Sequence, residues 1–143
     1  MKAGKRLWVV VSDGARARFF APGYEERGFK PTGPGELSSE VVHATISGVR
    51  HTIEPKHDYH RLEKRKFAHM VAEALDRAHA ERAFDQLLLV APRRSLGELR
   101  IVLSEQVKAS IKEIIAKDLT ANSNEELWKK LAPAVGRLSA AVV

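Results

Sequence analysis

Two short apolar runs predict strands that are buried on both faces of a sheet. Residues 7–12 read LWVVVS and residues 86–91 read QLLLVA, and each run is followed at once by turn or helix-breaking residues. Continuous runs of branched apolar residues over five or six positions are typical of central strands. These two segments therefore predict the middle of the sheet.

The first central strand is expected to open an antiparallel meander. Asp13-Gly14 is a strong turn signal. Residues 15–21 alternate arginines with apolar side chains, which indicates a second strand with one solvent-facing side. A weaker third strand is expected over residues 28–30, or restarting near residues 36–37.

A polar stretch separates the meander from a long predicted helix. Residues 38–58 show little periodicity, and we expect a long surface loop there. Helical spacing then extends from residue 59 to about residue 82, with Asp58 as the expected N-cap. The core-facing stripe of this helix consists of Phe67, Met70, Val71, Ala74, Leu75 and Ala78.

Helix and strand are expected to alternate to the C-terminus. An apolar stripe from Leu96 to Val107 predicts a helix after the second central strand. Residues 111–116 fit a helix by spacing, but a strand by length and β-branched content. Ser123 and Glu126 match a capping box that opens a last helix, in which Pro133 predicts a kink or a division.

The element order β-β-β-α-β-α-β-α indicates an α/β fold, a three-layer sandwich with a mixed sheet of about five strands. A chain of 143 residues that is 44% hydrophobic suits one domain over residues 1–143. No apolar run approaches a membrane span or the core of a signal peptide, so we expect a cytoplasmic protein that does not contact the membrane. The chain has no cysteine, which excludes disulfides, thiolate metal sites and cysteine nucleophiles.

Three motifs together resemble the bacterial host attachment protein family. They are VVVSDGARARFF, LLLVAPRRSLGELR, and KDLT at Lys117 to Thr120, and the resemblance covers roughly Leu7 to Leu131. It implies a fold similar to the central domain of archaeo-eukaryotic peptide chain release factors, with a ribonuclease-H-like sheet. The family name implies a role in bacterial attachment to a host surface and no particular reaction.

Release activity is not implied by this resemblance. Release factors place a glutamine at the peptidyl-tRNA ester through a Gly-Gly-Gln tip. This chain has no Gly-Gly pair, and its only glutamines are Gln86 and Gln106. No serine-nucleophile or phosphate-loop motif appears either, so no catalytic residue and no cofactor are predicted.

The positive charge of the chain predicts an anionic partner. The formal net charge of +6 favours polyanions. Arg93-Arg94 follows the second central strand, at the edge where open α/β sheets bind ligands, and guanidinium groups suit oxyanions. The alternative for this pair is that one arginine pairs with an acid of the fold, such as Glu98, while the other is solvated. The alternative for the basic residues at the start of the long helix is a solvated helix face. The candidate nucleic-acid- or anion-binding residues are Arg16, Arg18, Arg61, Lys64, Arg65, Lys66, Arg93 and Arg94.

Two sets of residues could bind a metal ion, but neither has a spacing that predicts a metal site. In ribonuclease-H-like nucleases a carboxylate on the first strand binds metal, so Asp13 and Asp118 are candidates, with Asp85 as a distant third. A turn and a helix entry explain the first two without metal. His57 and His60, in HDYH, could share a zinc ion, but a solvated loop explains them equally.

These observations predict a non-catalytic binding module that engages RNA, the ribosome or another polyanion through a basic edge. One alternative is a metal-dependent ribonuclease-H-like nuclease, which requires the carboxylates of Asp13 and Asp118 to approach shared metal ions. Another is an indirect role in attachment to a host surface. An adhesin would need export, and we identify no export signal.

Overall fold

The computed structural model describes the backbone of residues 6–23, 28–39 and 56–140, and the side chains of these residues except 56–63 and 140. Most of the predicted loop, residues 40–55, lies outside the described residues. Among the described segments, no helix combines the length and the apolar character that a membrane span requires.

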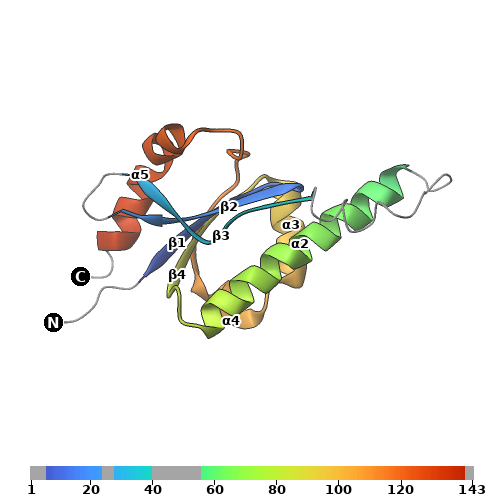
Figure 1. Ribbon diagram of the computed structural model, residues 1–143, viewed down its shortest axis with the longest axis horizontal. Helices are drawn as coiled ribbons and strands as arrows, with labels where there is room; N and C mark the ends of the chain where they lie inside the picture. The colour runs from blue at the N-terminus through green and yellow to red at the C-terminus, as the bar shows by residue number, and fades with distance from the viewer. Residues whose placement is uncertain (1–5, 24–27, 40–55, 141–143) are drawn as a thin grey trace.

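Five strands form one mixed sheet in the order β3-β2-β1-β4-β5 (Figure 1). β1 pairs antiparallel with β2, and β2 with β3, so the predicted meander is confirmed. β4 runs parallel to β1 and to β5. The strands are β1 (Leu7–Ser12), β2 (Arg16–Pro22), β3 (Phe29–Ser38), β4 (Gln86–Val90) and β5 (Ile111–Ile115).

Two strand predictions are sharpened by the sheet. The ambiguous segment 111–116 is a strand, because it pairs with the buried β4. The two fragments expected at 28–30 and 36–37 belong to one ten-residue strand. Its register against β2 shifts between Arg18 and Phe20, so residues 32–35 lie outside the regular pairing.

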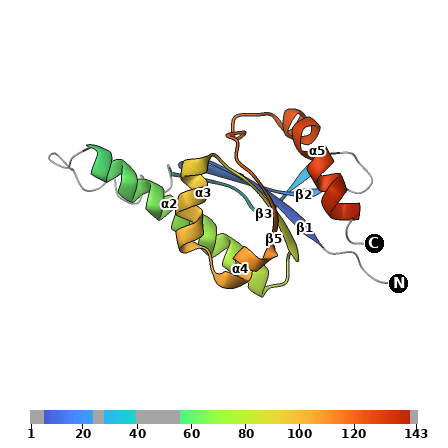
Figure 2. The same ribbon diagram turned by 180° about the vertical axis from the view of Figure 1, so that it is seen from behind.

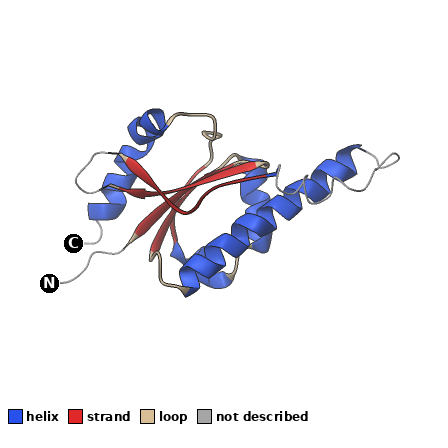
Figure 3. Cartoon of the chain, in the orientation of Figure 1, coloured by secondary structure: helices blue, strands red, loops and turns tan. Residues whose placement is uncertain are grey.

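Helices cover both faces of the sheet, which confirms the three-layer sandwich (Figures 2 and 3). One apolar core lies between the sheet and three helices, and a second core lies between the sheet and the last helix. On β1, Val10 faces the first core while Val9 and Val11 face the second. The first three helices are α2 (Lys56–Ala80), α3 (Arg93–Val102) and α4 (Glu105–Ser110), and the last is α5 (Asn124–Ala140).

Two predicted helix boundaries are wrong. α2 begins at Lys56, so Asp58 lies inside the helix and is not its N-cap. The single helix expected through Val107 is divided into α3 and α4. Leu103 adopts an extended conformation, and the Ser104 side chain accepts a hydrogen bond from Val107 N at 3.2 Å. A serine that caps locally competes with continuation of the helix.

The capping box of α5 is confirmed. Ser123 N donates to Glu126 Oε1 at 2.8 Å, and Glu126 N donates to Ser123 Oγ at 3.2 Å. These contacts lower the pKa of Glu126. The hydrogen bond from the Ser123 backbone is the larger cause, and the hydrogen bond with the Ser123 side chain is the second. Pro133 lies inside α5 without dividing it. Leu131 and Ala134, on either side of it, both remain buried against the sheet.

Candidate functional site

A groove of about 1080 Å³ lies at the carboxyl ends of β1 and β4. The two strands are parallel, so the segments that follow them, beginning at Asp13 and Pro92, meet at one edge of the sheet. α2 and α3 form the walls of the groove. The lining residues are Ser12, Asp13, Gly14, Ala15, Ser39, Lys64, Phe67, Ala68, Val71, Pro92, Arg93, Arg94, Ser95, Glu98, Leu99 and Asp118.

Both buried apolar residues and charged residues line the groove. Phe67, Val71 and Leu99 belong to the core and are at most 2% exposed. Three cations and three carboxylates line the same space, so their formal charges cancel. The cations are Lys64, Arg93 and Arg94, and the carboxylates are Asp13, Glu98 and Asp118.

The start of α3 contributes two arginines to the groove. Arg93 and Arg94 occupy its first turn, are exposed, and form no ion pair with any described residue. The N-cap is Pro92, which supplies no side-chain cap, and the first turn carries no acid. Because the first N–H groups of a helix lack intrahelical acceptors, this end is a partial positive charge beside two guanidinium groups.

Lys64 approaches the same edge from α2. Its side chain is packed so closely on the turn after β1 that a Cβ atom on Gly14 would lie 3.3 Å from Lys64 Cγ. Arg65 instead pairs with Glu98 at 3.3 Å. The Lys66 side chain is exposed outside the groove lining, and Arg61 lies on α2 with its side chain outside the described part.

Arg16 and Arg18 do not line the groove. Their neighbours Ala17 and Phe19 face the core under α2, so the two arginines extend from the opposite face of β2. Arg16 forms an exposed pair with Glu36 at 2.9 Å, and this hydrogen bond raises the pKa of Arg16. Of the eight basic residues that the sequence suggested as an anion-binding set, Lys64, Arg93 and Arg94 line the groove.

Arg18 fastens the loop between β5 and α5. Its guanidinium donates to Thr120 O at 3.2 Å, to Asn122 O, and to Asn124 Oδ1 at 2.6 Å, and it lies 5.1 Å from the centroid of the Phe20 ring. Burial lowers the pKa of Arg18. Its hydrogen bonds with described residues thus hold this loop against the sheet.

The carboxylates of Asp13 and Asp118 converge on one hydroxyl group. Thr120 Oγ1 lies 2.8 Å from Asp13 Oδ2 and 3.0 Å from Asp118 Oδ1. Asp13 Oδ1 accepts hydrogen bonds from Ala15 N and Arg16 N, each at 2.7 Å, and so holds its own turn. The sequence analysis placed Thr120 in the KDLT motif but not among the candidate site residues, although its place two residues after Asp118 is a local signal for such a hydrogen bond.

The other suggested metal ligands do not join this pair. Asp85 lies at the opposite end of β4, where it accepts from Arg6 N at 2.9 Å. The side chains of His57 and His60 are outside the described residues. Among the residues that the structure describes, no group of three His, Cys, Asp or Glu side chains could hold a metal ion.

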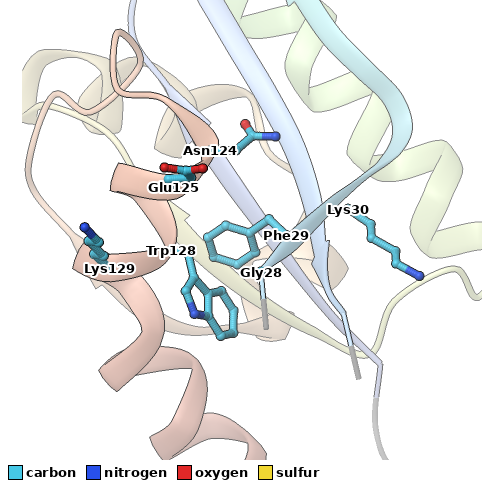
Figure 4. A pocket seen from close by; sticks show the side chains of 7 residues that line it. All are labelled: Gly28, Phe29, Lys30, Asn124, Glu125, Trp128 and Lys129. Carbon is cyan, nitrogen blue, oxygen red and sulfur yellow. The ribbon is translucent and has the colours of Figure 1, made fainter. Parts of the chain in front are cut away.

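A smaller cleft of about 320 Å³ lies between the start of β3 and α5 (Figure 4). Its apolar side is formed by Phe29 and Trp128, whose ring centroids are 5.1 Å apart at an angle of 82°. Trp128 is only partly buried against the second core. None of the eight predicted basic residues lines this cleft; the lysines beside it are Lys30 and Lys129.

Comparison with known proteins agrees with the resemblance seen in the sequence. The chain matches no curated protein. Residues 8–131 match the model of a family described as protein required for attachment to host cells. This match spans β1, the groove-forming segments and most of the sheet, and it ends inside α5. The chain therefore belongs to the host attachment protein family.

Proposed function

We propose that this protein is a non-catalytic binding module that holds RNA, or another polyanion, at the groove formed by α2, α3 and the carboxyl ends of β1 and β4. The observation that carries the proposal is the gathering of Lys64, Arg93 and Arg94 from two helices around one groove. Guanidinium groups and a helix N-terminus both suit phosphate oxygens.

Two further features support an anionic partner. The formal net charge of +6 attracts polyanions over a distance. Arg93 and Arg94 have no ion-pair partner among the described residues, so no ion pair with those residues has to break on binding. A role in attachment, which the family description names, would then be indirect and would act through the bound partner.

The nuclease alternative has less support from the site. Asp13 and Asp118 do converge, as that alternative requires. However, one oxygen of Asp13 already holds the turn after β1, and the hydroxyl of Thr120 lies between the two carboxylates. The geometry near these residues is accounted for by hydrogen bonds within the protein.

Replacing Arg93 and Arg94 together by alanine should weaken RNA binding about tenfold or more at low salt. Each phosphate contact contributes about 0.7–0.9 to the slope of log affinity against log salt, so the slope should become about 1.5 less steep. The measurement is a titration of a labelled single-stranded oligoribonucleotide at several salt concentrations.

The control variant is Lys129→Ala with Lys130→Ala. It removes the same charge from exposed positions on α5, which covers the other face of the sheet. It should change affinity much less than the arginine variant does. The proposal is wrong if the intact protein does not bind RNA at low salt, or if the two double variants weaken binding equally.

A further inference from the structure

We propose that the N-terminus of α3 is a subsite for a terminal phosphate, that is, a phosphomonoester at the end of an RNA chain or on a nucleotide. This proposal deepens the proposed function and rests on it for the RNA partner. It concerns a small part of the groove: the first turn of α3, Ser95, and the two arginines beside it. The ligand chemistry is a phosphate group with three free oxygens.

Ser95 is the observation that points to a ligand. It is the third residue of α3, only 8% of its surface is exposed, and it lines the groove. Its hydroxyl donates to no described residue. The first intrahelical bond of α3 is from Leu96 N to Pro92 O at 3.0 Å, so the N–H groups of the three preceding residues have no acceptor among the described residues.

These donors match a phosphomonoester. Such a group carries about −1.5 to −2 charges near neutral pH and has three acceptor oxygens. The first turn offers three backbone N–H groups and the Ser95 hydroxyl. The guanidinium groups of Arg93 and Arg94 can add charge-assisted, bidentate contacts. An ordinary phosphodiester has one charge and two free oxygens, and would leave part of this set unused.

The carboxylates of the groove favour the end of a chain over its middle. Asp13 and Asp118 line the groove together with the first turn of α3, and Glu98 lies one turn further along that helix. A phosphate backbone running through the groove would bring several phosphates near these carboxylates. A single terminal phosphate limits that repulsion to one group.

A nucleoside attached to that phosphate suits the remainder of the groove. Carboxylates accept hydrogen bonds from ribose hydroxyl groups, as acidic residues do in dinucleotide-binding folds. The groove therefore suits one terminal nucleotide better than a continuous phosphate backbone.

The test compares AMP with oligoribonucleotides of one sequence that carry a 5′-phosphate, a 3′-phosphate or only hydroxyl ends. We expect the intact protein to bind one phosphorylated form about tenfold more tightly than the hydroxyl form, the size typical of charge-assisted hydrogen bonds. Ser95→Ala should remove most of this preference, measured as the ratio of the affinities for the phosphorylated and hydroxyl forms. Ser139→Ala, an exposed serine on α5, is the matched control and should keep the preference.

The outcomes separate this inference from the proposed function. Equal binding of all three oligonucleotides, with Arg93 and Arg94 still required, would overturn the terminal-phosphate subsite and leave the RNA-binding proposal standing. Binding of AMP but of no oligonucleotide would support the subsite, identify a free nucleotide as its source, and overturn the RNA partner. A preference that survives in Ser95→Ala would overturn the assignment to α3.

Discussion

Replacing Gly33 by alanine should lower the free energy of unfolding by about 3 kcal/mol. Gly33 has a φ of +57°, and a Cβ atom there would lie 2.6 Å from Cη2 of the Trp8 ring. The left-handed conformation alone costs a side chain about 1–2 kcal/mol. Trp8 cannot move aside easily, because its ring packs between Phe19 and Phe84, and overpacking a core costs about 1–3 kcal/mol.

Gly35→Ala is the control for the Gly33 variant. Gly35 also has a positive φ, +74°, but no atom lies within 4 Å of the position that its Cβ would take. Its replacement should lower the free energy of unfolding only by the cost of the left-handed conformation, about 1–2 kcal/mol. Denaturant unfolding of both variants measures the difference. If Gly35→Ala is as destabilising as Gly33→Ala, then close packing of β3 on Trp8 does not constrain the fold.

Replacing Arg18 by alanine should lower the free energy of unfolding by about 2 kcal/mol. The side chain donates to two backbone carbonyls and one side chain of the loop between β5 and α5, and hydrogen bonds from charged groups contribute about 1.5–3 kcal/mol each when well buried. Partial exposure of the guanidinium reduces that sum. Arg18→Lys should be nearly as destabilising as Arg18→Ala, because lysine lacks the planar fork that reaches several acceptors at once.

Arg16→Ala provides the comparison for Arg18. It removes a neighbouring guanidinium from the same strand, but one that forms an exposed pair with Glu36. Surface pairs contribute roughly 0–1 kcal/mol, so this variant should be nearly as stable as the intact protein. Thermal or denaturant unfolding distinguishes the two. An equal loss from both variants would show that Arg18 does not hold the loop.

The central strands and the start of the last helix were predicted correctly because each is specified by residues that are close in the sequence. Buried runs such as residues 7–12 have few alternatives to a central strand, and the capping box at Ser123 and Glu126 forms within four residues. The break at Ser104 was missed because the apolar stripe continues across it. A stripe reports which face is buried, not whether the backbone between its residues stays helical.

The candidate site was predictable only in part, since it depends on which face of each strand is used. Arg93 and Arg94 were found because they follow a buried strand directly. Arg16 and Arg18 have the same chemistry, but the pleat of β2 directs them away from the groove. Thr120 was missed because its two acceptors, Asp13 and Asp118, meet only after the parallel strands pair.

The most direct test of the account is an amide NMR titration with a single-stranded oligoribonucleotide at low salt. We expect the largest shift changes at Gly14 and at Arg93, Arg94 and Ser95, and only small changes along α5. These amides surround the groove or belong to the first turn of α3. Shifts that concentrate instead near Trp128 and Lys129, or that are absent at saturating RNA, would contradict the assignment of this groove as the binding site.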